Sequence, residues 1–247
     1  MYGSRGRIGL LVPSVNTVVE AEGRMLLPMG YAALATRMRN EQGGAEDMAR
    51  MCTHIDRGVD ELLSARVDVI AFACTAGSFF EGDEGERALS QRLRGGSDVR
   101  TVTAAGAVAA ALHAVGARRV SMVTPYDPYL NELEVQFLTA RGFEVVSEAG
   151  MDIPHAFEIG IIPTAEVQRY ALEHLDPRAD ALFLSCTNLP TIQVIESLEQ
   201  ETGVPVVTSN QATYWDCLRS LGFEGTIEGY GRLLRQFQPS VVPAAAG

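Results

Sequence analysis

The chain has 247 residues, 47% of them hydrophobic, and its excess of acidic over basic residues gives a formal net charge of −11. This length and composition allow a substantial buried core, while the negative charge disfavours binding to nucleic acid and to anionic membrane surfaces. No apolar run reaches the roughly 20 residues that a membrane span requires, and the first residues lack a signal-peptide pattern, so we expect a cytoplasmic protein.

Short apolar segments alternate with longer segments of helical periodicity along the chain. The segments predicted as strands are residues 8–12, 32–35, 67–73, 120–123, 181–184 and 204–207. The segments predicted as helices are residues 16–27, 45–65, 104–115, 128–140, 164–174, 191–201 and 211–221. Most of the strand segments are apolar on both faces, which is typical of a parallel sheet covered by helices. The pattern predicts an α/β fold.

The two halves of the chain repeat each other. The matching segments are residues 7–14 with 119–126, residues 67–75 with 180–187 and, more loosely, residues 99–103 with 204–208. Pro125 follows Pro13 by 112 residues, and Cys186 follows Cys74 by the same 112 residues. A repeat of this kind predicts two lobes with the same plan.

We expect these lobes to be pseudo-symmetric, each with a mainly parallel sheet flanked by helices, and to form a single unit over residues 1–247. The first lobe is predicted to comprise about residues 1–103 plus the C-terminal segment 212–247, and the second about residues 104–211. Ligands of parallel sheets bind beyond the carboxyl ends of the strands. We therefore expect the active site in the cleft between the lobes.

The chain has four cysteines, which is too few and too scattered for a disulfide framework. Cys74 and Cys186 occupy matched positions, each in a polar loop directly after a predicted strand. Free cysteines often only pack in a core, but two at equivalent positions of a repeat indicate a function. Cys52 and Cys217 lie within helical patterns and are interpreted as packing residues.

Each of these two loop cysteines is followed by threonine and then by a turn. Backbone N–H groups in such a loop, together with the start of a helix, are predicted to lower the thiol pKa below its usual value of about 8.5. The thiolate is the nucleophile and base that chemistry without a cofactor requires. Cys74 and Cys186 are therefore the candidate catalytic residues.

Other polar residues of the strand-end loops are candidates for substrate binding. Ser14 and Asn16 follow the first predicted strand. The loops after the other strands contain Thr75, Tyr126, Thr187 and Asn188. The Asn16 amide could bind a carboxylate, or it could cap a helix together with Glu20. Tyr126 could donate to a developing enolate oxygen or simply pack. Both alternatives stay open at this point.

The sequence favours neither a metal nor a cofactor. The four histidines show no ligand spacing with one another or with the cysteines. The first strand runs into Pro-Ser-Val-Asn instead of a glycine-rich phosphate-binding turn. We therefore expect no metal site and no cofactor, with a small carboxylate as the partner.

The motifs VPSVNT (residues 12–17), ACT (73–75), VTPY (123–126) and LSCTN (184–188) resemble the aspartate/glutamate racemase superfamily, and within it most closely the maleate cis-trans isomerases, which are related to the arylmalonate decarboxylases. The resemblance implies that the Cys74 thiolate adds to the double bond of maleate and that Cys186 exchanges a proton or completes the addition from the other side. It also implies that Asn16, Tyr126 and the loop amides near Thr75 and Thr187 hold the carboxylates. Arylmalonate decarboxylases carry glycine where Cys74 stands, which argues against decarboxylation.

One departure from the isomerase pattern concerns the substrate. Isomerases of this family commonly have an asparagine before the Glu-Ile-Gly stretch, where this chain offers His155, either as a substrate-binding residue or as an ordinary surface histidine. Alternative functions are a two-cysteine racemase of an amino acid or hydantoin, for which Asp127 is an available acidic group, and a non-catalytic carboxylate-binding protein. The resemblance also implies a possible homodimer.

Overall fold

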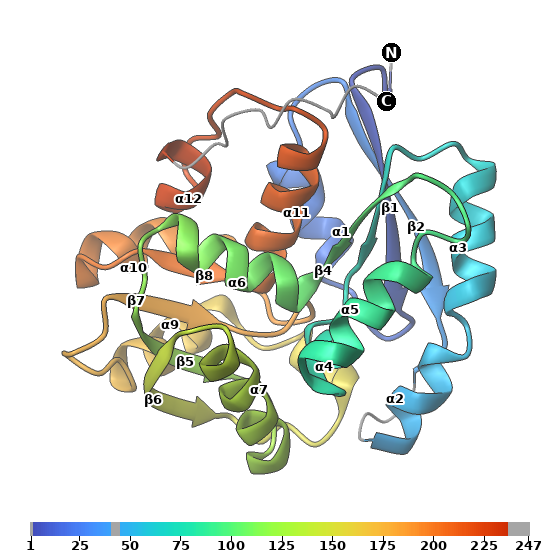
Figure 1. The fold of residues 1–247 in the computed structure, drawn as a ribbon. Helices are drawn as coiled ribbons and strands as arrows, with labels where there is room; N and C mark the ends of the chain where they lie inside the picture. The colour runs from blue at the N-terminus through green and yellow to red at the C-terminus, as the bar shows by residue number, and fades with distance from the viewer. Residues whose placement is uncertain (1, 41–44, 237–247) are drawn as a thin grey trace.

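The computed structural model describes residues 2–40 and 45–236, which form two four-stranded parallel sheets flanked by helices (Figure 1). The first sheet, in the order β2-β1-β3-β4, consists of β1 (Gly6–Pro13), β2 (Tyr31–Met38), β3 (Val69–Phe72) and β4 (Arg100–Thr103). The second, in the order β6-β5-β7-β8, consists of β5 (Arg119–Thr124), β6 (Glu144–Gly150), β7 (Ala181–Leu184) and β8 (Val206–Thr208). The shared strand order confirms the predicted α/β class and its two similar lobes.

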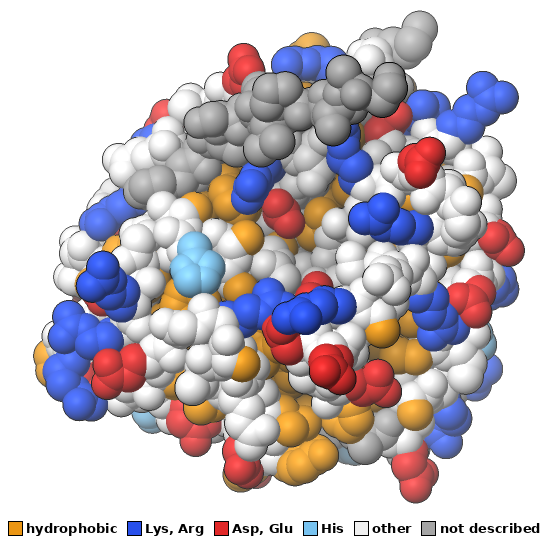
Figure 2. All heavy atoms as spheres, viewed as in Figure 1, with side chains coloured by type: hydrophobic (Ala, Val, Ile, Leu, Met, Phe, Trp, Pro, Cys, Tyr) orange, Lys and Arg blue, Asp and Glu red, His pale blue; other side chains and the backbone are white. Residues whose placement is uncertain are grey.

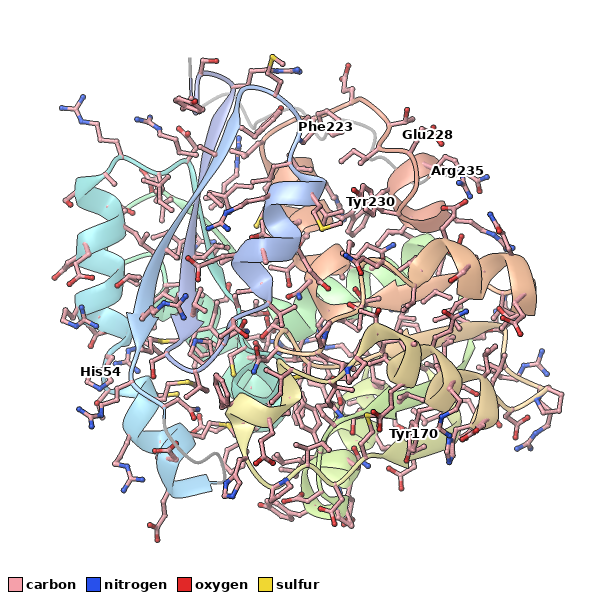
Figure 3. All side chains as sticks on the ribbon, turned by 180° about the vertical axis from the view of Figure 1, so that it is seen from behind. His54, Tyr170, Phe223, Glu228, Tyr230 and Arg235 are labelled. Carbon is pink, nitrogen blue, oxygen red and sulfur yellow. The ribbon has the colours of Figure 1, made fainter. Side chains whose placement is uncertain are left out.

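The helices follow the predicted periodicity, with one division and several additions. They are α1 (Val19–Leu26), α2 (Ala45–Cys52), α3 (Ile55–Ser64), α4 (Thr75–Phe79), α5 (Gly82–Arg92), α6 (Ala104–Ala114), α7 (Pro128–Ala140), α8 (Ala156–Ile159), α9 (Thr164–Glu173), α10 (Ile195–Thr202), α11 (Ser209–Ser220) and α12 (Gly231–Gln236). The segment predicted as one helix over 45–65 is divided into α2 and α3, and His54 lies at the break (Figure 3). The helices α4, α5, α8 and α12 were not predicted as separate elements.

The two segments of the loosest repeat match, residues 99–103 and 204–208, have the same structural role. Thr103 ends β4 and its hydroxyl accepts a hydrogen bond from the N–H of Gly106 at 3.2 Å, which caps α6. Thr208 ends β8 and caps α11 in the same way, through the N–H of Gln211 at 3.2 Å. Equivalent threonines therefore end a strand and start a helix in both lobes.

The two helices that follow these caps lie between the sheets and pack against each other (Figure 1). α11 also contacts α1, β3 and β4 of the first sheet, so the chain returns to the first lobe after β8. The predicted lobe boundaries themselves stay a prediction, and residues 237–247 of the predicted first lobe lie outside the described residues.

The surface carries both signs of charge. The basic side chains are all arginines, because the chain contains no lysine. On the face shown in Figure 2, arginine and acidic side chains lie beside each other without one sign dominating. In the described ranges, no helix combines the length and the apolar character of a membrane span.

Candidate active site

A cavity of about 330 Å³ lies where the carboxyl ends of the central strands of both sheets meet. Residues at or just beyond the ends of β1, β3, β5 and β7 all reach it. Its lining comprises Pro13, Val15, Asn16, Asn40, Met48, Cys74, Thr75, Ala76, Tyr126, Asp127, Leu130, Asp152, Ile153, Pro154, Ala156, Ile159, Cys186, Thr187 and Asn188. The repeat therefore brings together two thiols that are 112 residues apart in sequence.

Most of the candidate residues lie in this cavity, but two do not. Ser14 and His155 are not part of the lining. The Ser14 hydroxyl donates to the backbone oxygen of Asn40 and accepts from its N–H, both at 2.9 Å. His155 is exposed at the start of α8, and its side chain makes no capping hydrogen bond there. Substrate contacts of these two residues stay predictions.

Cys74 starts α4, and its sulfur accepts a hydrogen bond from the N–H of Gly77 at 3.4 Å. Glycine is required there for close approach. A Cβ atom at Gly77 would lie 2.9 Å from the Phe72 ring and 3.2 Å from the sulfur of Cys74. The strand end and the first turn of α4 thus enclose the thiol on one side, while its other side faces the cavity.

Cys186 has an unusual backbone conformation. Its φ of 90° lies in the left-handed region that non-glycine residues rarely adopt. The N–H of Cys186 donates to the hydroxyl of Ser209 at 3.0 Å, and its oxygen accepts from the N–H of Leu189 at 3.1 Å. Its sulfur accepts from the N–H of Asn188 at 3.4 Å. Strain of this kind persists only where neighbours fix it, and it is often found at functional sites.

The charge state of the thiols differs from the sequence prediction. Burial raises the pKa of Cys74 to about 12 and that of Cys186 to about 11, and the N–H groups of Gly77 and Asn188 only partly oppose this shift. The predicted lowering of both pKa values is therefore wrong for this structure. The physical reason is that α4 is a helix of five residues with little dipole, while the cavity walls are largely apolar. Burial therefore favours the neutral thiol over the thiolate for both residues.

Asn16 caps a helix, as one of the two sequence alternatives had it, and its substrate-binding role stays a prediction. Its side-chain oxygen accepts from the N–H groups of Val18 and Val19 at 2.9 and 3.0 Å, so it caps the start of α1. Glu20 takes no part in this cap and pairs with Arg37 instead. The Asn16 amide nitrogen donates to Thr187 of the other lobe at 3.1 Å, which leaves one of its two N–H donors for a ligand.

Asn188 also connects the two halves of the site. Its side-chain oxygen accepts from the N–H of Thr17 at 2.9 Å, and its amide nitrogen donates to the oxygen of Ala156 at 2.7 Å. Asn188 therefore orders the loops around the cavity, and its contact with a substrate stays a prediction.

The sequence interpretation missed a buried polar layer beneath the cavity. The hydroxyl of Ser209 accepts hydrogen bonds from the Thr75 hydroxyl at 2.9 Å and from the N–H of Cys186 at 3.0 Å, so one serine touches both cysteine loops. Asn210 donates to Glu22 at 2.7 Å and to the Thr187 oxygen at 3.0 Å. The available signal was position, because Ser209 and Asn210 follow β8 as the cysteines follow β3 and β7.

The cavity offers neutral donors to an anion. Tyr126 is buried, and burial raises the pKa of its hydroxyl well above its ordinary value, so the hydroxyl keeps its proton. Asp127 caps α7 through the N–H of Leu130 at 2.8 Å. Among the described residues that line the cavity, none carries a positive charge. A bound carboxylate would therefore depend on hydrogen bonds from amides and hydroxyls.

The chain is similar over most of its length to proteins of one family. Residues 8–234 match the family described as arylmalonate decarboxylase. A maleate isomerase from Nocardia farcinica is 35% identical over 240 residues, which cover 93% of this chain and 96% of that protein. A Pseudomonas putida maleate isomerase variant with alanine for cysteine, solved with maleate, has a TM-score of 0.89 at 29% identity and covers 93% of this chain and 97% of its own. A cysteine-to-serine mutant of the Nocardia farcinica enzyme with a covalently bound succinylcysteine intermediate has a TM-score of 0.89 at 33% identity, covering 94% of this chain and 98% of its own.

Proposed function

The chain belongs to the arylmalonate decarboxylase family, and from this membership and the two thiols in its cavity we propose that it isomerises maleate, or a related small unsaturated dicarboxylate, to the trans isomer without a cofactor. The observation that carries the proposal is the pair Cys74 and Cys186 on one cavity. Decarboxylases that resemble this chain have glycine at the position of Cys74, so a thiol there favours isomerisation. The similarity to maleate isomerases over nearly the whole chain supports the same substrate class.

The proposed reaction uses the two thiols in different roles. Cys74 reacts in its minor thiolate form, after its proton has passed to solvent, and its sulfur forms a bond to one alkene carbon while the π electrons move toward the carboxylate on the other alkene carbon. The other carbon takes a proton from Cys186. Rotation about the resulting single bond follows. The Cys186 thiolate then removes the proton again, the carbon–sulfur bond breaks, and fumarate leaves with the Cys74 thiolate restored.

The carboxylates are held by the neutral donors of the cavity. The free N–H of Asn16, the hydroxyl of Tyr126 and the loop amides beside Thr75 and Thr187 are the available groups. Hydrogen bonds to an enediolate grow stronger as negative charge develops on its oxygens. The cavity of about 330 Å³ is small, which suits a four-carbon acid.

The first test follows maleate by proton NMR with metal-stripped protein. We expect the maleate signal to be replaced by that of fumarate without any added cofactor. Unchanged maleate over long incubation would contradict the proposal, and racemisation of an amino acid or hydantoin in the same preparation would favour the racemase alternative.

Ser209 supplies a prediction about the support of the site. Because it accepts from both Thr75 and Cys186, Ser209→Ala leaves two buried donors without a partner and loosens the left-handed conformation of Cys186. We expect kcat to fall by about 10–100-fold with a smaller change in KM, since a positioning error affects the reacting geometry most. Steady-state kinetics on maleate measure both constants.

The matched control is Ser220→Ala at the far end of the same helix, α11, which should leave kcat unchanged. Equal kcat values for Ser209→Ala and the unsubstituted protein would show that Ser209 does not support the reacting geometry.

A further inference from the structure

Glu134 is a buried carboxyl group that the proposed mechanism does not use. It lies on α7 and is 2% exposed. One carboxyl oxygen, Oε1, accepts a hydrogen bond from the Ser185 hydroxyl at 2.7 Å. The other, Oε2, is buried without a hydrogen-bond partner among the described residues. A buried carboxylate with a single hydrogen bond is costly in free energy, so a functional role for this group has to outweigh that cost.

The charged groups on the elements around Glu134 do not stabilise a negative charge on its carboxyl group. α7 packs on α4, α5 and β6. α4 has no titratable side chain, and Asp83 and Glu86 on α5 pair with Arg141, which follows α7 at its far end. Glu144 and Glu148 on β6 are exposed. The neutral acid is therefore the favoured form of Glu134 at neutral pH, because burial raises its pKa to about 8 against the single hydrogen bond from Ser185.

The one hydrogen bond of Glu134 leads to the active site. Ser185 immediately precedes Cys186 and is fully buried at the end of β7. Burial and negative charge on Cys186 and Glu134 raise the pKa of Tyr126, and a hydrogen bond with Ser185 partly opposes this rise. Burial raises the pKa of Cys186, and hydrogen bonds from Asn188 and Tyr126 partly oppose this rise. Negative charge on Glu134 raises the pKa of Cys186 further. A continuous chain of groups thus joins the carboxyl to the second thiol.

We propose that Glu134 is a positioning residue that, acting through Ser185 and Tyr126, allows Cys186 to give up its proton when the carboxyl is neutral and holds that proton on Cys186 when the carboxyl is ionised. The inference deepens the proposed function, which requires Cys186 to become a thiolate during each turnover. Two negative charges on neighbouring buried groups oppose each other, because the surroundings screen them poorly. Ionisation of Glu134 at higher pH therefore opposes turnover.

Glu134→Gln tests this inference, since it keeps the shape of the side chain and removes its ionisation. The matched control is Glu132→Gln, which makes the same change on an exposed residue of the same helix. The first measurement is the rate of Cys186 alkylation by iodoacetamide against pH, followed by mass spectrometry of the peptide that carries Cys186. We expect the midpoint of this profile to shift to lower pH in Glu134→Gln and to stay unchanged in Glu132→Gln.

The second measurement is kcat for maleate across the same pH range. The kcat of the unsubstituted protein divided by that of Glu134→Gln should fall by about tenfold as pH rises through the Glu134 pKa of about 8, because the gain of Cys74 thiolate with pH is common to both proteins. If maleate is not converted at all but the alkylation midpoint shifts, the proposed substrate is wrong and the role of Glu134 stands. Coincident alkylation profiles in folded Glu134→Gln and the unsubstituted protein would overturn the inference.

Ser185→Ala provides a second variant in case Glu134→Gln does not fold. Ser185→Ala removes the hydrogen bond that favours the carboxylate, which should raise the Glu134 pKa further, and it also breaks the connection to Tyr126. The fall in kcat should therefore move to higher pH and become smaller than in the unsubstituted protein. A fall at unchanged pH would also overturn the inference.

Discussion

Replacement of Cys74 by serine is expected to lower kcat for maleate by about a thousandfold or more while the protein stays folded. The serine hydroxyl is a far weaker acid than a thiol and forms almost no alkoxide in this largely apolar cavity. The hydrogen bond from the Gly77 N–H, 3.4 Å from the sulfur, can persist to the smaller oxygen, so the loop should keep its conformation. Initial rates by proton NMR and thermal unfolding of the same samples measure the two effects separately.

The control for this substitution is Cys52→Ser, which changes another partly buried cysteine on α2 outside the active-site cavity. It should retain full turnover. Full turnover in Cys74→Ser would refute the two-thiol mechanism, and an equal loss in both variants would point to instability as the cause.

The companion variant Cys186→Ser separates addition from the later steps. Cys74 can still attack the double bond, and the other carbon then takes its proton from solvent water, whereas the return proton transfer lacks the Cys186 thiolate as its base. We expect intact-protein mass spectrometry to show Cys186→Ser with an added mass of one maleic acid, located on the peptide of Cys74. A succinylcysteine in the cysteine-to-serine mutant of the Nocardia farcinica relative is the same kind of adduct.

The repeat made the architecture predictable because it set the position of each central strand twice. Strands that are buried on both faces, such as β1, β3, β5 and β7, can be recognised in the sequence as apolar runs. The edge strand β6 was missed, because Glu144 and Glu148 leave one side of it exposed and break the apolar pattern. An edge strand has a neighbouring strand on one side only, so it tolerates polar residues that face the solvent.

The contents of the cavity were predictable from strand ends, but the ionisation of its groups was not. Position alone placed Cys74 and Cys186 correctly at the carboxyl ends of equivalent strands. The thiol pKa depends on how much water and how many donors surround the sulfur, which is a property of the assembled fold. The same limit applies to Ser209, whose hydrogen bonds reach back 134 residues to Thr75.

Replacement of Glu22 by leucine is expected to reduce the free energy of unfolding by about 3–5 kcal/mol, the largest stability effect that we predict. Glu22 lies on α1 and is 5% exposed. Its carboxyl oxygens accept from the N–H groups of Thr191 and Ile192 at 2.7 and 2.9 Å and from Asn210 at 2.7 Å. Leucine leaves these three buried donors without an acceptor.

The matched control is Glu20→Leu on the same helix, which breaks a partly exposed ion pair with Arg37 and should cost about 1 kcal/mol or less. Urea unfolding at neutral pH measures both variants. Similar losses for Glu20→Leu and Glu22→Leu would show that the buried hydrogen bonds of Glu22 carry no special weight.

The pH dependence of Glu22→Gln provides a further test of the same residue, because its sign follows from burial. Burial raises the pKa of Glu22 above 4.5, and the hydrogen bonds from Ile192, Thr191 and Asn210 only partly oppose this. The folded protein therefore binds this proton more tightly than the unfolded chain, and the stability linked to it is lost as pH rises from about 4.5 through the folded pKa. The advantage of the unsubstituted protein over Glu22→Gln should accordingly be largest in acid and decrease toward neutral pH. A carboxylate dominated by its three hydrogen bonds would give the opposite slope, so the slope alone decides whether burial or hydrogen bonding governs this connection between the lobes.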